Sequence, residues 1–261
     1  MRIATWNINS VRLRIAHVLR FIKEQNIDVM CLQETKTEDM FFPINDFENI
    51  GMMHSSFRGE KSYNGVAILS KIPIKRKKYE LWCGINDTRH VFVVLANDLK
   101  IHNFYVPAGG DVPDIKLNEK FNHKINFIKE MTKYFNQNKL SKTILVGDLN
   151  IAPYEHDVWS HKQLLKVVSH TPIETELLKK LIDASNWIDV GRKYIPKEEK
   201  LYSWWSYRNK DWKKSNRGRR LDHIWVSQDL DSSCQSFSSC KEIRDWEKPS
   251  DHVPLILELN V

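Results

Sequence analysis

The sequence has 261 residues, a formal net charge of +7 and a pI near 9.1, and 41% of its residues are hydrophobic. With 9 Gly and 9 Pro, this composition excludes a disordered chain and is typical of a globular protein with a substantial core. No apolar run approaches the roughly 20 residues of a membrane span, and the N-terminus lacks a signal-peptide pattern, so we expect a soluble, cytoplasmic protein. The positive charge favours a polyanionic partner.

The four cysteines are scattered along the chain. They form no Cys-x-x-Cys pair and have no histidine at zinc spacing, which argues against a disulfide framework and against a zinc site. We expect free thiols in a reducing compartment. The residues are Cys31, Cys83, Cys234 and Cys240.

The first part of the chain alternates strand and helix. Residues 2–6 and 27–32 are apolar runs that predict buried strands, and Glu34 closely follows the second run. Residues 12–25 have apolar side chains at helical spacing, which predicts an amphipathic helix that covers a sheet, with Arg14 off its apolar face. The apolar face comprises Ile15, Val18, Leu19 and Ile22.

The middle of the chain predicts three more strands and a helix. Residues 65–69, 91–96 and 100–106 are strand-like runs, and residues 121–135 repeat apolar side chains at helical spacing. The basic run at residues 75–78 lies between two of these strands. We interpret it as the solvated face of a hairpin rather than as a polyanion site.

A central strand is predicted at the run Thr-Ile-Leu-Val-Gly-Asp-Leu-Asn, residues 143–150. Its apolar part is buried on both faces, and it ends in a carboxylate and a carboxamide, Asp148 and Asn150. In isolation, this pattern is ordinarily a strand followed by an Asx turn. Only partners elsewhere in the chain can give it a chemical function.

The last part of the chain predicts a helix and two strands. Thr171 begins a capping-box motif with Pro172 at the first helical position, so we expect a helix from there. Residues 221–226 and 253–259 are the closing strands. Because the sequence shows no repeat or linker, we expect one domain over residues 1–261.

Polar side chains gather at the ends of the predicted strands. Four stand at carboxyl ends, whereas three stand at the beginnings of the two closing strands. If those two strands run antiparallel to the others, all of these groups share one rim of the fold. The first set is Asn7, Glu34, Tyr105 and Asp148, and the second is Asp222, Asp251 and His252.

Such a rim would bring at least four carboxylates together, and their repulsion is costly without a cation. Carboxylate and carboxamide oxygens suit a hard ion such as Mg²⁺ or Mn²⁺. A metal held by Glu34 and Asn7 can neutralise charge on a phosphate, while an aspartate deprotonates water. His252, kept protonated by Asp222, can then hydrogen-bond a phosphate oxygen. These parts predict phosphodiester hydrolysis.

Residues 201–220 interleave aromatic and basic side chains. Positive charge engages backbone phosphates while aromatic rings stack on bases or fill a gap in a duplex, so the stretch favours a nucleic-acid surface. Individually, Trp204 and Trp205 are equally compatible with a hydrophobic core. The aromatic residues are Tyr202, Trp204, Trp205, Tyr207 and Trp212, and the basic ones are Arg208, Lys210, Lys213, Lys214, Arg217, Arg219 and Arg220.

Seven motifs in this order resemble the exonuclease III class of apurinic/apyrimidinic (AP) endonucleases, within the endonuclease/exonuclease/phosphatase superfamily. The resemblance covers nearly the whole chain. It implies a four-layered α/β sandwich with two mixed, largely antiparallel sheets, in agreement with a shared rim. The motifs occupy residues 6–12, 32–36, 65–67, 105–107, 147–150, 220–222 and 248–252.

The resemblance implies a role for each rim residue. Glu34 would be the principal metal ligand, Asp148 would activate water and Asn150 would orient it, while Tyr105 would contact the phosphate. The implied metal-binding set is Asn7, Glu34, Asp148, Asn150, Asp251 and His252. The implied catalytic set is Tyr105, Asp148, Asn150, Asp222 and His252. The implied DNA-binding set is Trp204, Trp212, Arg217, Arg219 and Leu221.

The implied reaction is Mg²⁺-dependent hydrolysis 5′ to an abasic site, with Mn²⁺ able to substitute for Mg²⁺. It leaves a 3′-hydroxyl and is accompanied by 3′→5′ exonuclease and 3′-repair activities on duplex DNA with abasic sites or blocked 3′ ends. The setting would be base-excision repair by a monomer in the cytoplasm, associated with the nucleoid if the source is bacterial.

Two positions depart from the pattern. Ala108 stands where family members often have Gln or Asn, and Arg219 stands where an apolar residue is expected. Trp204 and Leu221 would still line a pocket for a flipped-out abasic sugar. The balance between AP endonuclease and exonuclease activity is therefore open.

Two other functions compete with this one. The first is a superfamily enzyme that acts on a phospholipid head group or an inositol phosphate, against which the basic and aromatic stretch argues. The second is a nucleic-acid-binding protein that retains the fold without catalysis. It is disfavoured because every expected catalytic position is filled.

Overall fold

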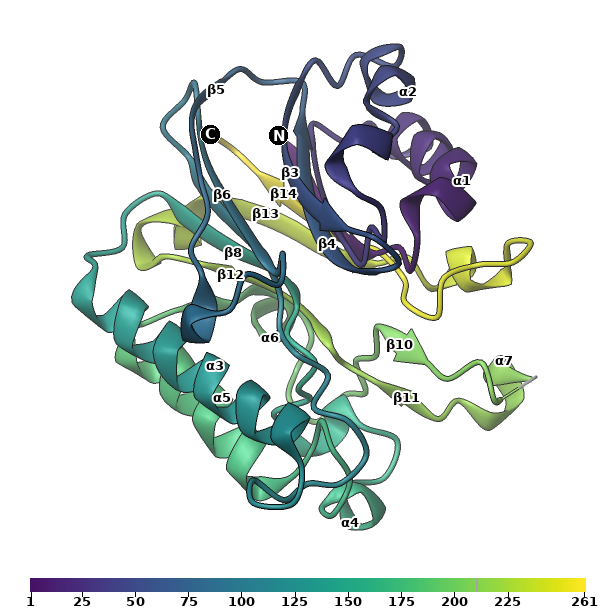
Figure 1. Ribbon diagram of the computed structural model, residues 1–261, viewed down its shortest axis with the longest axis vertical. Coiled ribbons are helices and arrows are strands. Elements are labelled where there is room, and N and C mark those ends of the chain that lie inside the picture. Colours follow the sequence, from purple (N-terminus) through teal and green to yellow (C-terminus); the bar gives the residue numbers. More distant parts are fainter. Residues whose placement is uncertain (210) are drawn as a thin grey trace.

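The computed structural model describes residues 1–209 and 211–261, so Lys210 of the basic and aromatic stretch lies outside the described residues. Two six-stranded sheets pack face to face, and helices cover the outer face of each sheet (Figure 1). The predicted four-layered α/β sandwich is thus confirmed. In the described part of the chain, no helix is long and apolar enough to cross a membrane. The cysteines are free thiols, as expected.

The first sheet contains the N- and C-terminal strands. It comprises β1 (Arg2–Asn7), β2 (Val29–Gln33), β3 (His54–Glu60), β4 (Tyr63–Ser70), β13 (Cys234–Ser239) and β14 (Leu255–Leu259). Their order is β13-β14-β1-β2-β4-β3. β1 and β2 run parallel, whereas the other neighbours run antiparallel. β3 and β13 were not expected from the sequence, because they are partly exposed edge strands without a buried apolar run.

The second sheet is also mixed. It comprises β5 (Ile74–Lys78), β6 (His90–Leu95), β7 (Lys100–Tyr105), β8 (Thr143–Asp148), β9 (Ile188–Asp189) and β12 (Asp222–Val226). Their order is β5-β6-β7-β8-β12-β9, with β7 and β8 parallel and the other neighbours antiparallel. The basic run is the exposed edge strand β5, hairpin-paired with β6, and lysines there discourage edge-to-edge association.

Helices form the two outer layers. α1 (Val11–Glu24) and α2 (Ile44–Glu48) cover the first sheet, and α3 (Glu119–Gln137) and α5 (Pro172–Ala184) cover the second (Figure 1). The predicted capping box at Thr171 and Glu174 is present. The short helices are α4 (His161–Leu164), α6 (Val190–Tyr194) and α7 (Trp212–Ser215). The short 3₁₀ segments are η1 (Asp39–Phe41), η2 (Trp82–Gly84), η3 (Glu155–Asp157), η4 (Gln228–Ser233) and η5 (Lys241–Asp245).

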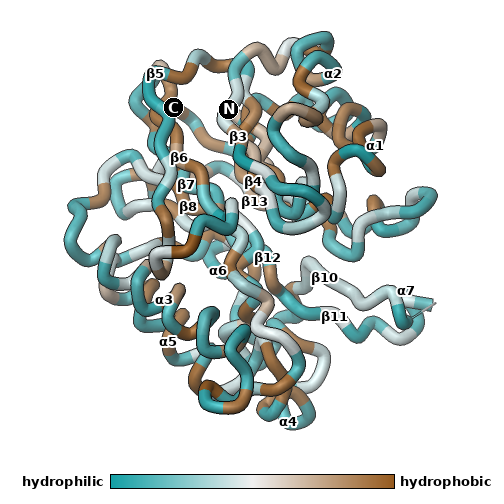
Figure 2. Tube along the Cα trace, in the orientation of Figure 1, coloured by the Kyte–Doolittle hydropathy of each residue, from teal (hydrophilic) through white to brown (hydrophobic). Residues whose placement is uncertain are grey.

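A two-stranded arm, β10 (Trp204–Trp205) and β11 (Gly218–Arg219), extends beside the sandwich (Figure 1). Figure 2 shows apolar residues along the strands and on the inner sides of the long helices, while the arm and α7 are largely hydrophilic. The arm therefore belongs to the surface of the fold, although individual side chains within it are buried.

Two aliphatic faces form the layer between the sheets. Ile3 and Val29 from the first sheet pack in one cluster with Val93 and Ile144 from the second. Close to the rim, Gln33 Nε2 donates to Asn103 Oδ1 (2.6 Å), and Asn103 Nδ2 donates to the Leu32 and Ala67 carbonyls (2.9 Å each). These buried hydrogen bonds join strands of the two sheets, so they fix how the sheets sit against each other.

Arg14 of α1 is buried although it lies off the apolar face of the helix, because its guanidinium donates to the Ile8, Asn9 and Lys248 carbonyls. Helical spacing alone cannot reveal a loop that folds over the helix start and supplies carbonyl acceptors. The consequence is that Arg14 holds the segment that leaves β1.

The shared rim is confirmed by strand direction. β14 runs antiparallel to β1, and β12 runs antiparallel to β8, with Asp222 directly opposite Asp148. Residues that end β1, β2, β7 and β8 thus lie beside residues that begin β12 or precede β14.

Gly147 offers a test of how tightly β8 is packed beneath this rim. Its φ is +140°, and an added Cβ would lie 1.9 Å from the Phe104 carbonyl oxygen. We expect Gly147→Ala to lower the free energy of unfolding by about 3 kcal/mol or more, measured by urea denaturation.

Gly51 is the matched control for that substitution. Its φ is also positive (+87°), but no atom lies within 4 Å of an added Cβ. Gly51→Ala should therefore cost only about 1 kcal/mol, the cost of left-handed backbone alone. Equal losses in the two variants would contradict the proposed clash.

Candidate active site

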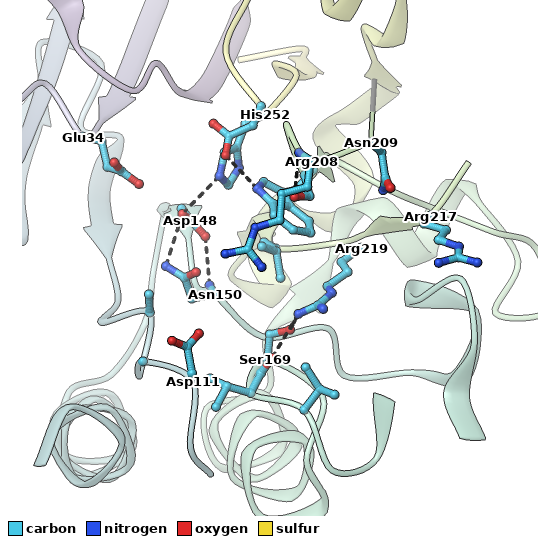
Figure 3. Close-up of a pocket in the computed structure, with 18 of the residues that line it drawn as sticks. Glu34, Asp111, Asp148, Asn150, Ser169, Arg208, Asn209, Arg217, Arg219 and His252 are labelled. Atoms are coloured by element: carbon cyan, nitrogen blue, oxygen red, sulfur yellow. Dashed lines mark hydrogen bonds and ion pairs between the residues drawn. The ribbon is translucent and has the colours of Figure 1, made fainter. Parts of the chain in front are cut away.

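A cleft of about 640 Å³ opens at the shared rim (Figure 3). Its floor carries the acidic and imidazole groups that end or precede the central strands, including Glu34, Asp148 and His252. Its walls come from the β10–β11 arm, the segment after β7 and the segment that precedes α5. Wall residues include Asp111, Trp159, Val168, Ser169, Trp204, Arg208, Arg217, Arg219 and Leu221.

The floor of the cleft is a compact group of donors. Glu34, Asp148 and His252 each present an atom within 4.8 Å of the others. The Asn7 amide connects the two carboxylates, because its Nδ2 donates to Glu34 Oε1 (2.8 Å) and Asp148 Oδ2 (2.9 Å). The sequence placed these four residues on one rim, and the structure brings them into direct contact.

His252 lies between two carboxylates. Its Nδ1 is 2.7 Å from Asp222 Oδ2, and its Nε2 is 3.8 Å from Asp148 Oδ2. Burial alone would lower the pKa of His252, but the charges of Asp222 and Asp148 outweigh it and raise that pKa. The ring is therefore held as an imidazolium, with Asp222 fixing its orientation.

Asp148 is buried and fully engaged. Its Oδ1 accepts from the Asn150 backbone N–H (2.9 Å), and its Oδ2 accepts from Asn150 Nδ2 (3.2 Å) as well as from Asn7. Burial raises the pKa of Asp148, and the neighbouring charges of Asp222 and Glu34 act in the same direction against His252. A carboxylate with a raised pKa accepts a proton more readily than an ordinary aspartate.

Glu34 has its own counter-cation. Lys36 Nζ lies 2.7 Å from Glu34 Oε2 and also donates to Asn9 Oδ1 (2.7 Å). Burial would raise the pKa of Glu34, but the Lys36 charge and the Asn7 hydrogen bond hold that pKa below its usual value. Lys36 thus supplies positive charge at this rim that was not expected from the sequence, in addition to that of His252.

Asp251 joins the floor to the wall. Its Oδ1 accepts from Asn9 Nδ2 (3.1 Å), and its Oδ2 accepts from Trp204 Nε1 (2.9 Å). Burial would raise the pKa of Asp251, but the charge of His252 and these two hydrogen bonds hold it below its usual value. Asp251 is thus an anion that positions the Trp204 indole.

Tyr105 stays a neutral phenol. Burial, together with the charges of Glu34 and Asp148, raises the pKa of Tyr105 well above its usual value. The Arg89 guanidinium lies 5.0 Å from the centre of its ring. Tyr105 also lines the cleft, so its hydroxyl is a neutral donor at the rim.

The donor set fits a hard divalent cation, because Glu34 and Asp148 offer carboxylate oxygens within reach of one ion. Asn7 directs its NH₂ group at both carboxylates and accepts from the Asn9 N–H (3.1 Å) with its Oδ1. A metal at this point would therefore require the Asn7 amide to turn over. The Nδ1 atom of His252 is already engaged by Asp222.

Four of the five predicted DNA-binding residues lie in the cleft, and one lies elsewhere. Trp204, Arg217, Arg219 and Leu221 line the cleft, but Trp212 lies outside it. The Trp212 ring packs against Trp205 at 5.1 Å, and its Nε1 donates to Asp245 (3.2 Å). Trp212 is thus placed as part of the arm's own packing.

Other members of the basic and aromatic stretch are wholly structural. Tyr202 and Trp205 are buried, and Arg220 is buried against Asp157 and Asp189 (Nη1 to Asp189 Oδ2, 2.9 Å). The expectation that Arg220 adds to a phosphate-binding surface was wrong. In such a stretch, only the packing of the arm decides which side chains face solvent.

Sequence reasoning missed a buried ion pair beneath the cleft. Lys124 Nζ lies 2.6 Å from Glu174 Oε1 and donates to the Asn150 carbonyl (2.8 Å). Glu174 also accepts from the Ser169 backbone N–H (2.9 Å). A signal was present, because Lys124 falls on the apolar stripe of its helix, between Phe121 and Ile128.

Residues 4–252 match the endonuclease/exonuclease/phosphatase family. The chain belongs to this family. Exodeoxyribonuclease III of Haemophilus influenzae is 32% identical, with 99% of each chain covered. The DNA repair nuclease APEX1 of Danio rerio is 27% identical, covering 100% of this chain and 83% of that protein.

Two solved structures of related proteins share the fold. An AP endonuclease from Archaeoglobus fulgidus superposes with a TM-score of 0.93 at 32% identity, over 100% of both chains. The 3′ phosphatase NExo from Neisseria, bound to a product DNA hairpin, superposes with a TM-score of 0.92 at 27% identity, again over 100% of both chains. The sandwich is thus that of DNA-processing members of the family.

The Lys124–Glu174 pair generates a stability prediction. Lys124→Met leaves Glu174 buried without a cation and removes the support of Asn150, so the free energy of unfolding should fall by about 3–5 kcal/mol in urea denaturation. Lys129→Met, at an exposed position on the same helix, should change it by less than about 0.5 kcal/mol. Similar effects of the two substitutions would show that the pair is unimportant.

Proposed function

We propose that this protein is a metal-dependent DNA phosphodiesterase of base-excision repair. It incises duplex DNA 5′ to abasic sites and also removes nucleotides and blocking groups from 3′ ends. The observation that carries the proposal is the group of half-buried Glu34 with buried Asp148 and His252 at the floor of a cleft with a cationic and aromatic wall. Such a wall suits a nucleic-acid backbone, and such a floor suits its hydrolysis.

The relatives support the choice of substrate. A bacterial relative is an exodeoxyribonuclease III, a vertebrate relative is a DNA repair nuclease, and one related structure is an AP endonuclease. A further related structure is a 3′ phosphatase bound to a DNA hairpin. Incision at abasic sites and 3′-end repair are therefore the two activities that we assign to this cleft.

Each floor residue has a proposed task in hydrolysis. Asp148, whose pKa burial raises, takes a proton from the attacking water, and Asn150 holds that carboxylate in place. His252, charged and oriented by Asp222, donates a hydrogen bond to the phosphate. The neutral Tyr105 hydroxyl donates another.

We propose Mg²⁺ as the metal, with Mn²⁺ able to substitute. Glu34 and Asp148 would hold it, with Asn7, Asn150 and Asp251 close by. When bound, the ion neutralises charge that develops on the phosphate. We assign His252 to the phosphate rather than to the metal, because two carboxylates keep its ring protonated.

We also propose that the protein works as a single-domain monomer. The aliphatic cluster shared by both sheets supports one domain over residues 1–261, and residues from both sheets complete the cleft. One chain thus contains every group named above, which favours a monomer. We propose that it acts on DNA in the cytoplasm, at the nucleoid if the source is bacterial.

Cleavage of a labelled duplex with one stable abasic analogue tests the function. In Mg²⁺ we expect incision 5′ to the analogue and trimming of 3′ ends, and in EDTA neither. Asp148→Asn should lower the rate at least about 10³-fold while DNA binding persists, because it removes the proton acceptor and a proposed metal ligand but leaves the cationic and aromatic wall of the cleft unchanged. An inactive wild-type protein in both Mg²⁺ and Mn²⁺ would favour a binding protein, and cleavage of inositol phosphates alone would favour the other enzyme class.

Metal binding provides an independent test. Glu34→Gln removes one carboxylate ligand, so the Mn²⁺ affinity measured by calorimetry should fall at least about tenfold. Glu198→Gln removes an exposed carboxylate that does not line the cleft and should leave that affinity unchanged. Equal affinities of the two variants would remove Glu34 from the metal site.

A further inference from the structure

Arg219 stands at the position in the cleft wall where the family resemblance led us to expect an apolar residue. It lies on β11 directly opposite Trp204 on β10, and its guanidinium carbon is 5.3 Å from the centre of the indole. Its Nη1 donates to Ser169 Oγ (2.8 Å) and to the Val168 carbonyl (3.1 Å). The guanidinium is thus held in place within the cleft (Figure 3).

Trp204 connects this cation to the catalytic floor. Its Nε1 donates to Asp251, and its backbone forms a β-bridge with His252. The indole therefore has the floor at one edge and Arg219 over its ring. Arg219 and the indole line the same cleft as the floor, so a substituent on a phosphate held at the floor can reach this part of the wall.

Ser169, which accepts a hydrogen bond from Arg219, has a strained backbone conformation. Its φ is +88°, a region that side chains other than glycine rarely adopt, and Glu174 fixes its backbone N–H. The hydroxyl that this backbone presents is the acceptor for Arg219 Nη1. A glycine would relieve the strain but would release the guanidinium.

We propose that Arg219 is a specificity-determining residue that selects 3′-terminal phosphodiesters whose far substituent is anionic, such as a 3′-phosphoglycolate, over neutral abasic sugars. An arginine binds a carboxylate through charge-assisted hydrogen bonds, whereas a neutral sugar gains more from an apolar neighbour. The Arg219 guanidinium forms no ion pair with a carboxylate among the described residues, since its partners are the Val168 carbonyl and the Ser169 hydroxyl. Asp111, on the facing wall, is exposed.

The selected reaction is the hydrolysis already proposed for the floor, on which this inference rests. Water attacks phosphorus, and the bond between phosphorus and the 3′ oxygen of the upstream nucleotide breaks. That oxygen takes up a proton and leaves as a 3′-hydroxyl, while phosphoglycolate departs with the oxygen from water. Arg219 takes no part in bond breaking and holds the departing carboxylate.

Two duplexes that differ in one group test the inference. One ends in a 3′-phosphoglycolate and the other in a 3′-phosphate ester of ethylene glycol, in which a neutral hydroxymethyl replaces the carboxylate. We expect the wild-type protein to prefer the glycolate in kcat/KM by about tenfold to a hundredfold, and Arg219→Gln to abolish that preference. The same substitution should raise incision at a neutral internal abasic analogue relative to glycolate removal.

Two further variants complete the experiment. Arg217 also lines the cleft, but its guanidinium stacks on Trp159 at 4.7 Å, so Arg217→Gln should slow both end-blocked substrates equally and leave their ratio unchanged. Ser169→Gly keeps the Arg219 charge but removes its hydroxyl acceptor, so the preference should fall part of the way.

The possible results distinguish the role of Arg219 from the phosphodiesterase activity on which it rests. If the wild-type protein cleaves neither end-blocked duplex nor the abasic one, the phosphodiesterase proposal fails and this inference fails with it. If it cleaves all of them but shows no glycolate preference, or if Arg219→Gln keeps the wild-type ratio, only the role of Arg219 is overturned.

Discussion

Gathering carboxyl groups at one buried rim is unfavourable, and the rest of the site depends on how that charge is offset. Lys36 pairs with Glu34, His252 lies between Asp222 and Asp148, and the Asn7 amide connects the carboxylates of Glu34 and Asp148. These partners keep the rim folded while leaving room for one more positive charge. The same arrangement separates the pKa values of Glu34 and Asp148, so that one carboxyl suits a cation and the other a proton.

The buried Lys124–Glu174 ion pair contacts two separate parts of the cleft lining. Lys124 supports the Asn150 carbonyl, and Glu174 supports the Ser169 backbone, so α3 and α5 position both Asn150 and the Ser169 hydroxyl that accepts from Arg219. Because the pair is buried, removing one partner costs more than the pair itself contributes. The geometry of the cleft floor at Asn150 and of the cleft wall at Arg219 is therefore coupled through the helices behind them.

The arm shows why sequence pattern stops short of a binding surface. Trp204 and Arg219 face the cleft, while their chain neighbours Trp205 and Arg220 are buried, as expected for side chains that alternate along strands. The alternation is fixed by the strands, but its phase is fixed by what the arm packs against. Arg220 is buried because it pairs with Asp157 and Asp189, whereas Arg219 lies in the cleft and donates to Ser169.

The sequence by itself determined the central strands and the rim, because apolar periodicity and strand-end motifs are local features of the chain. Its motifs also carried the family resemblance, and that resemblance implied the four layers. The sequence did not reveal the edge strands β3 and β13, the buried state of Arg14 and Arg220, or the brace formed by Lys124 and Glu174. Those features depend on partners that are distant in sequence, and only tertiary packing brings such partners within hydrogen-bonding distance.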